Sequence, residues 1–101
     1  MVSDILGAWV VDLEDVNSLD KLGEVLLNFS KEGILRYSIF NGEKEEVILM
    51  TYRLENDIIE TSQPSHPDEI KRTQFKLIGD VLYLNFNGEQ SRFLRLDNGY
   101  L

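Results

Sequence analysis

Apolar and polar residues alternate along most of this sequence, in short runs that are separated by turn-forming residues. Alternation with a period of two is typical of strands with one buried face, and closely spaced runs of this kind favour antiparallel neighbours. The predicted strands are Ile5–Asp12, Val25–Ser30, Ile34–Phe40, Glu46–Leu54, Ile58–Ser62, Lys71–Ile78, Val81–Phe86 and Gln90–Leu96. We therefore expect an all-β fold in which consecutive strands pair as a meander.

The turns between these strands predict how the strands pair. Gly79-Asp80 and Asn87-Gly88 each supply two residues that tolerate positive φ, as two-residue hairpin loops require. The segment 31–33 ends in a glycine and suits a three-residue loop with that glycine in the left-handed conformation. Weaker turn signals are Asn41-Gly42 and Glu55-Asn56.

These turns sort apolar from polar side chains, because loop length fixes which residues face each other across a hairpin. In the second half of the chain, Leu77 then faces Leu82, Phe75 faces Leu84 and Leu82 faces Phe93. The predicted inward face there comprises Thr73, Phe75, Leu77, Leu82, Leu84, Phe86, Ser91, Phe93 and Arg95. In the first half it comprises Val25, Leu27, Phe29, Leu35, Tyr37, Ile39, Ile48, Met50, Tyr52, Ile59 and Thr61.

The same parity leaves Val47 and Leu49 pointing outward, which apolar side chains do less often. Strands joined in sequence leave two unpaired edges unless the sheet closes, and closure removes both edges. The expected architecture is a single domain over residues 1–101, an eight-stranded antiparallel up-and-down meander that closes into a small barrel.

Two segments do not fit strands. Leu13–Glu24 predicts a loop with one short helical turn, capped by Ser18 and ended by Gly23, that covers one mouth of the barrel. Ser62–Ile70 contains two prolines and predicts a loop at a rim.

Gly7, Trp9 and Arg95 form a further pattern. A Gly-x-Trp on the first strand, with an arginine on the inward face of the last strand, resembles the calycin superfamily of lipocalins and fatty-acid-binding proteins. The resemblance implies a lipocalin-like barrel in which the arginine packs across the indole ring and closes one end. A guanidinium stacks favourably on an indole face. In the predicted register Asp80 faces Arg95 and is expected to join it at the rim.

Charge and composition narrow the possible partners. The formal net charge is −8, which disfavours binding to nucleic acid or to anionic membrane surfaces. The same charge suits solubility, or faster association with a basic protein. The chain has no cysteine, which fits a reducing compartment. We find no secretory signal and no apolar run near the ~18 residues of a membrane span, so we expect a cytoplasmic location.

No pairing of a nucleophile with a base stands out, so we expect neither an enzyme nor a cofactor. His66, the single histidine, lies between Ser65 and Pro67 in the predicted rim loop, and we expect it to be solvated rather than a base or a metal ligand. Five acids cluster in the first loop: Asp12, Glu14, Asp15, Asp20 and Glu24. Calcium favours oxygen ligands of this kind. The spacing of a calcium-binding loop is missing, so we expect a solvated loop and no metal site.

The inward polar residues allow two functions. One is a non-enzymatic lipocalin-like domain that binds a small apolar molecule in a cavity, with Tyr37, Met50, Tyr52, Thr61, Phe75 and Ser91 as its ligand-binding residues. Thr73 is a further inward polar residue that could line this cavity. The alternative is an acidic interaction module, such as an inhibitor or immunity-type protein, with a filled barrel. Its acidic loop, with Asp12, Glu14, Asp15 and Asp20, would then bind a basic partner.

Overall fold

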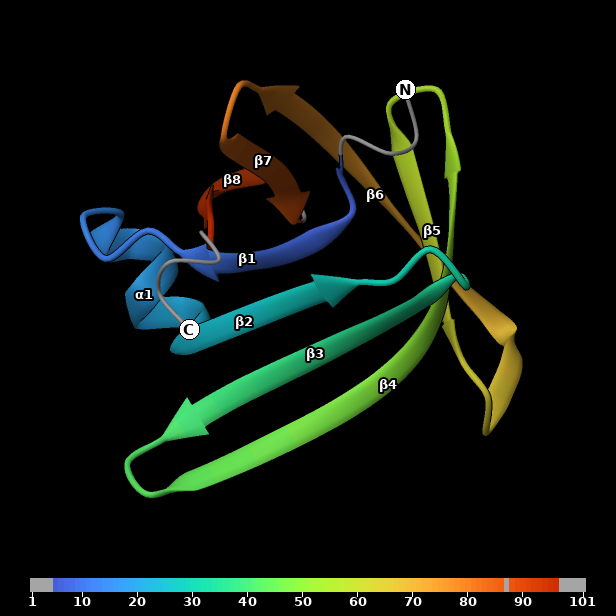
Figure 1. The fold of residues 1–101 in the computed structure, drawn as a ribbon, viewed down its shortest axis with the longest axis horizontal. Coiled ribbons are helices and arrows are strands. Elements are labelled where there is room, and N and C mark those ends of the chain that lie inside the picture. The colour runs from blue at the N-terminus through green and yellow to red at the C-terminus, as the bar shows by residue number, and fades with distance from the viewer. Residues whose placement is uncertain (1–4, 87, 97–101) are drawn as a thin grey trace.

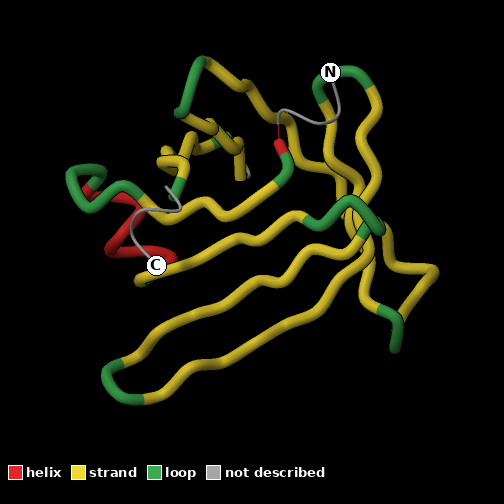
Figure 2. Tube along the Cα trace, viewed as in Figure 1, coloured by secondary structure: helices red, strands yellow, loops and turns green. Residues whose placement is uncertain are grey.

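The computed structural model describes residues 5–86 and 88–96 and is almost entirely composed of strands (Figure 1, Figure 2). The strands are β1 (Gly7–Val11), β2 (Glu24–Phe29), β3 (Ile34–Asn41), β4 (Lys44–Glu55), β5 (Ile58–Gln63), β6 (His66–Ile78), β7 (Val81–Phe86) and β8 (Glu89–Arg95). A short helix, α1 (Val16–Leu22), lies between β1 and β2.

Each strand pairs antiparallel with the next, and β1 also pairs with β8, so the sheet closes into a barrel. The predicted up-and-down meander of eight strands is therefore confirmed. In Figure 1, α1 sits beside the start of β2, and β3 and β4 form a long hairpin whose tip lies on the same side of the barrel as α1.

The predicted cross-strand pairs are also confirmed. They include Phe75–Leu84, Leu77–Leu82 and Leu82–Phe93 in the second half, and Val25–Ile39, Leu27–Tyr37 and Phe29–Leu35 in the first. Gly33 ends its loop with φ 86°, the left-handed conformation that glycine adopts readily. The weaker turn signals were wrong by one residue, because the loops are residues 42–43 and 56–57. Of the last predicted turn, Asn87 lies outside the described residues.

Ser62–Ile70 is not the rim loop that its two prolines predicted. β5 continues to Gln63 and β6 begins at His66, and these two residues pair across a two-residue turn. The register shifts between Thr61 and Gln63, so the ladder is irregular there. Pro67 is tolerated because it lies near the start of β6, in this irregular stretch. The hairpin between β5 and β6 is therefore longer than expected.

The helix begins earlier than predicted. Asp15, and not Ser18, is the N-cap residue, and its side chain accepts a hydrogen bond from the Ser18 backbone N–H. Aspartate is favoured at the N-cap as strongly as serine, because its carboxylate also accepts from N–H groups of the first turn. Gly23 ends the helix as predicted, with its N–H bonded to the Leu19 carbonyl.

One end of the barrel is closed by an arginine stacked on a tryptophan. The guanidinium carbon of Arg95 lies 4.3 Å from the centroid of the Trp9 ring, and its Nε donates to Asp80 at 3.0 Å. Both contacts were predicted. The fully buried indole donates its N–H to the Ile5 carbonyl at 2.8 Å. β1 begins at Gly7, whose φ is 111°, rather than at Ile5 as predicted.

The hydrophobic core is concentrated on one side of the barrel. Eight of its fully or nearly fully buried side chains come from β1, β2, β7 and β8: Trp9, Val11, Val25, Leu27, Phe29, Leu82, Leu84 and Phe93. The other four strands, β3 to β6, contribute only Leu35 and Ile59 to the buried apolar set among the described residues. The interior beside β3 to β6 is therefore less tightly filled than the interior beside β1.

The outer surface of the barrel has an apolar row of side chains and, elsewhere, a cluster of ion pairs. Val47 and Leu49 point outward as predicted, with 39% and 55% of their surface exposed. Val47 ends a registered outer row that is apolar except for one serine: Ile78, Val81, Leu94, Val10, Leu26, Ser38 and Val47. On the opposite wall, Glu60 of β5 lies 2.7 Å from Arg53 and 2.9 Å from Arg72. The hydrogen bond from Arg53 is the main reason that the pKa of Glu60 is lowered.

We predict that Trp9→Ala lowers the free energy of unfolding by about 3–5 kcal/mol, because a large buried ring is removed. Arg95→Ala should cost about 1 kcal/mol, since its stacking partner remains packed. Urea unfolding followed by circular dichroism measures both. Trp9→Phe, which keeps a ring but loses the bond to Ile5, should fall between the two. A loss near zero for Trp9→Ala would mean that this contact does not hold the barrel end.

Candidate functional site

A cavity of about 500 Å³ lies inside the barrel, on the side where the core is sparse. Its wall is formed by residues of β2 to β7 and by Leu22 of α1. The apolar members of this wall are Leu22, Leu27, Phe29, Leu35, Ile39, Ile48, Met50, Ile59, Leu84 and Phe86. This volume is within the range of small-molecule sites, and a mainly apolar wall with few polar groups is their usual form.

The polar groups of the wall are concentrated on two strands. Thr61 and Gln63 of β5, and Lys71 and Thr73 of β6, lie together, and Thr61 pairs directly with Lys71 across the ladder. The one polar residue elsewhere in the described wall is Tyr37 of β3. The cavity therefore has a polar side at β5 and β6, and an apolar surface over most of the remainder.

Exposure shows where the cavity meets solvent. Among the wall residues, Gln63 and Lys71 are exposed, whereas Thr73 is buried. The polar side is therefore at the mouth of the cavity, and the buried apolar residues form its floor. Burial raises the pKa of Tyr37, so this phenol stays protonated and keeps a hydroxyl that can donate.

Three of the six predicted ligand-binding residues line this cavity: Tyr37, Met50 and Thr61. Tyr52 is not in the wall, because its hydroxyl donates to the Ser30 carbonyl at 2.6 Å and its ring meets Phe29 edge-on at 5.0 Å.

The other two predicted residues also lie elsewhere. Phe75 packs against the core cluster, and Ser91 is buried in a separate depression beside α1. Sequence reasoning missed Gln63 as a wall residue because it fell in the predicted rim loop, and missed Lys71 although it began the predicted strand Lys71–Ile78. The inward position of Lys71 was readable from Thr73, since residues two apart on a strand share a face.

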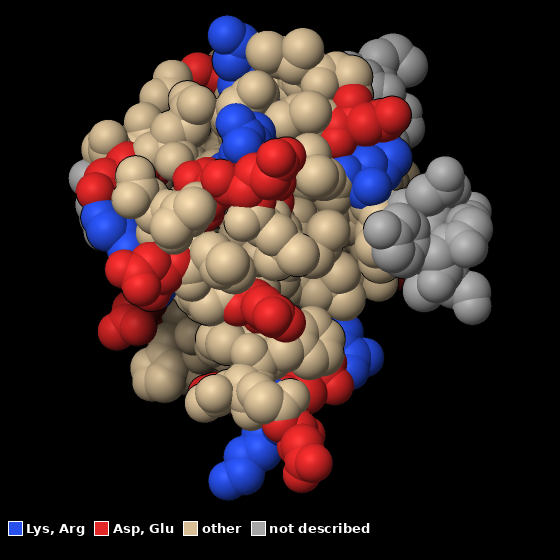
Figure 3. Space-filling model, turned by 90° about the vertical axis from the view of Figure 1, so that its left-hand side faces the viewer, with Lys and Arg blue, Asp and Glu red and all other residues tan. Residues whose placement is uncertain are grey.

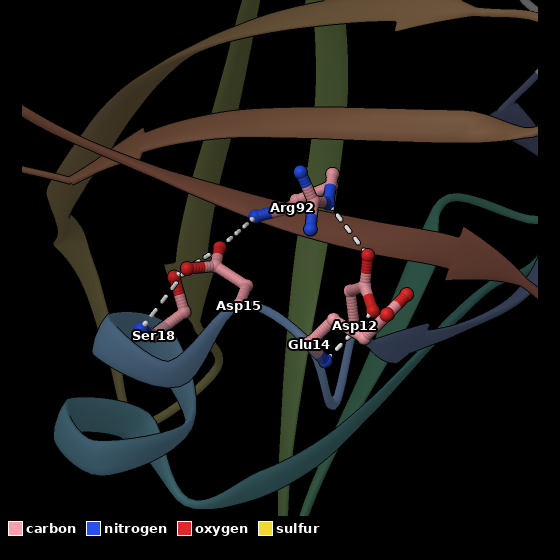
Figure 4. Close-up of polar contacts among 5 residues, drawn as sticks. All are labelled: Asp12, Glu14, Asp15, Ser18 and Arg92. Atoms are coloured by element: carbon pink, nitrogen blue, oxygen red, sulfur yellow. Dashed lines mark hydrogen bonds and ion pairs between the residues drawn. The ribbon is translucent and has the colours of Figure 1, made fainter.

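The opposite end of the barrel is held by a network around Arg92 of β8 (Figure 4). Its Nε donates to the buried Asp12 carboxylate at 2.6 Å, and its backbone N–H donates to Asp15 at 3.0 Å. The Asp12 carboxylate also accepts from the Glu14 backbone N–H at 2.9 Å. This network fixes the segment after β1 against β8 and so positions α1, whose Leu22 lines the cavity.

Asp15 serves both the helix and the strand. Its carboxylate accepts from the Ser18 hydroxyl at 2.7 Å and from the Ser18 backbone N–H at 3.4 Å, besides the bond from Arg92. These bonds favour the charged form, so the pKa of Asp15 is lowered, with the Ser18 hydroxyl as the main cause.

The acidic loop therefore differs from the solvated loop that was predicted. Asp12 is buried and Asp15 is half-buried, and both bind within the protein, whereas Glu14, Asp20 and Glu24 are exposed. No group of three or more His, Asp or Glu among residues 5–86 and 88–96 is placed to hold a metal ion. Figure 3 shows acidic and basic side chains interspersed over the face that it presents, rather than gathered into one acidic patch.

His66 lies at the first position of β6 and not in a loop, which corrects the predicted position. It is exposed, as expected, and its Nδ1 lies 2.9 Å from the hydroxyl of Ser65. The exposed ring borders a shallow depression with Glu69 and Ile70, next to the mouth of the cavity.

Comparison with known proteins gives no match: no protein-family profile, no curated protein and no solved structure is significantly similar to this chain. Within the described part of the chain, no helix is long and apolar enough to cross a membrane.

We predict that Asp15→Ala lowers the free energy of unfolding at neutral pH by about 1–2 kcal/mol, because the cap of α1 and the bond to Arg92 are lost. Asp20→Ala, which removes the same charge from an exposed position of α1, is the control and should change stability little.

The effect of Asp15 should also depend on pH. Its pKa is lower in the folded protein, so its contribution is complete above its unfolded pKa and declines as the pH falls below about 4. The difference between wild type and Asp15→Ala, measured by urea unfolding, should shrink over that range. A constant difference down to pH 2 would contradict the charged role of Asp15.

Proposed function

We propose that this domain is a calycin-like barrel that binds a small apolar molecule in its interior and does not act as an enzyme. The observation that carries the proposal is the cavity of about 500 Å³, with its apolar floor and its polar mouth at β5 and β6. A filled barrel needs no such space, because small barrels are commonly packed with side chains.

The likeness to calycins is supported by the closed end of the barrel. Arg95 of the last strand stacks on Trp9 of the first strand at 4.3 Å, and Gly7 precedes this tryptophan in the Gly-x-Trp pattern. A closed end leaves the other parts of the interior available for a ligand.

A binding role fits the wall better than catalysis does. The polar wall residues are Tyr37, Thr61, Gln63, Lys71 and Thr73, and no described wall residue is a histidine, aspartate or glutamate. General acid–base chemistry most often uses those three residue types. The wall groups present can orient a ligand by hydrogen bonds.

The acidic interaction module receives less support. Asp12 and Asp15 of its expected working surface bind to Arg92, which leaves only Glu14 and Asp20 of that set exposed. The net charge of −8 remains the main argument for a basic partner.

We predict that the protein binds N-phenyl-1-naphthylamine, an uncharged apolar probe that becomes fluorescent when it leaves water. Met50→Trp should weaken this binding at least about tenfold, because the larger side chain fills the cavity. Leu49→Trp is the matched control, since Leu49 is the next residue of β4 and is 55% exposed on the outside. Circular dichroism checks that both variants fold.

An absence of probe binding by the wild-type protein would overturn the proposed function. Equal weakening by both tryptophan variants would also count against it, because the probe would then not be inside the barrel.

A further inference from the structure

The charge inside the cavity is restricted to one residue. Of the described residues that form the wall, Lys71 is the only one with a charged side chain. It lies on β6, directly opposite Thr61 of β5, and two residues before the buried Thr73. The ammonium group is therefore attached to the polar side of the wall, at the mouth.

Lys71 has no ion-pair partner within residues 5–86 and 88–96. Its described side-chain contact is with the aromatic ring of Phe86, whose centroid lies 6.0 Å from the ammonium nitrogen. Phe86 is also a wall residue, so the ammonium group is held on the cavity side of β6. The nearest acid in the sequence, Glu69, lines the neighbouring depression together with Lys71, and the two side chains form no ion pair.

The arginines of the described chain form ion pairs, unlike Lys71. Arg36, Arg53, Arg72 and Arg92 all pair with carboxylates. Among the described residues, Lys31, Lys44 and Lys76 also have no ion pair, and Lys71 differs from them because it lines the apolar cavity. A cation beside an apolar volume favours a ligand that supplies the opposite charge, because the attraction is stronger where little water intervenes.

We propose that the ligand is a small apolar molecule with a single anionic group, and that Lys71 binds this group at the mouth of the cavity. The inference rests on the proposed binding function and specifies the ligand class. The apolar part of the ligand would lie against Leu35, Ile59 and Leu84 on the floor, while Thr61 and Gln63 donate hydrogen bonds beside Lys71. No acid lines this cavity, and Lys71 supplies the single charge of its described wall.

The test uses two probes that share one ring system and differ in charge. These are 1-anilinonaphthalene-8-sulfonate, which is an anion, and N-phenyl-1-naphthylamine, which is neutral. Lys71→Met should weaken binding of the sulfonate about 5- to 10-fold and leave the neutral probe nearly unchanged, because only the charge-assisted contact is lost. Lys71→Arg should keep the affinity for the sulfonate within about twofold, because the cation is retained.

Lys76→Met is the matched control, since Lys76 is on the same strand but on the outer face, opposite Tyr83. It should leave both affinities unchanged. Thermal melts check that each variant folds as the wild type does.

The outcomes separate the two proposals. If Lys71→Met leaves the affinity for the sulfonate unchanged, or if Lys76→Met weakens it equally, the role of Lys71 is overturned and the apolar binding site stands. If neither probe binds the wild-type protein, both proposals are overturned together.

Discussion

The pairing of β1 with β8 is the constraint on which the rest of the barrel depends. This seam is short, since Trp9, Val10 and Val11 are the β1 residues that are paired with β8. Backbone pairing of this length needs support from side chains. Two arginines of β8 supply it: Arg95 stacks on Trp9 at one end of the seam, and Arg92 binds Asp12 at the other. Side-chain contacts therefore stabilise the β1–β8 pairing at both of its ends, and closure of the sheet leaves no unpaired strand edge.

The interior of the barrel is filled unevenly, most densely beside this seam. Large buried side chains lie around the seam and fill that half of the barrel. They include Trp9 of β1 and Phe93 of β8. Strands β3 to β6 form the other half, whose inward residues include small or polar side chains such as Thr61 of β5 and Thr73 of β6. Tight packing on one side and sparse packing on the other produce a rigid wall and an open volume in the same small domain.

The fold could be predicted to a large extent because turn chemistry and side-chain alternation agree. The loops at 31–33 and 79–80 each fix a register, and the apolar face follows from it. The contact between Arg95 and Trp9 was predicted from the Gly-x-Trp pattern and the arginine on the last strand, which resemble those of calycins. The extent of β6 was missed because proline usually ends a strand, and the local bulge that admits Pro67 leaves no mark in the sequence.

The site was harder to predict than the fold. Parity alone places Tyr37, Met50 and Tyr52 on the same inward face, yet it does not say which of them a neighbour covers. Tyr52 is covered because its hydroxyl reaches the Ser30 carbonyl in the loop after β2. The bonds from Arg92 to Asp12 and Asp15 join residues about eighty positions apart, and no local pattern reports such a contact. Long-range polar contacts of this kind depend on the packed geometry.

The Arg92 network has a consequence for how the chain is made. Asp12 and Arg92 are separated by 80 positions, so the first strand leaves the ribosome long before its partner exists. Until β8 is synthesised, one edge of β1 has no strand to pair with, and its outward Val10 and inward Trp9 both lack their final neighbours. Non-local pairing of this kind slows folding, and unpaired edges of unfinished sheets are prone to aggregate. Synthesis of β8 therefore covers the last unpaired edge of the sheet and supplies the final neighbours of Trp9 and Val10.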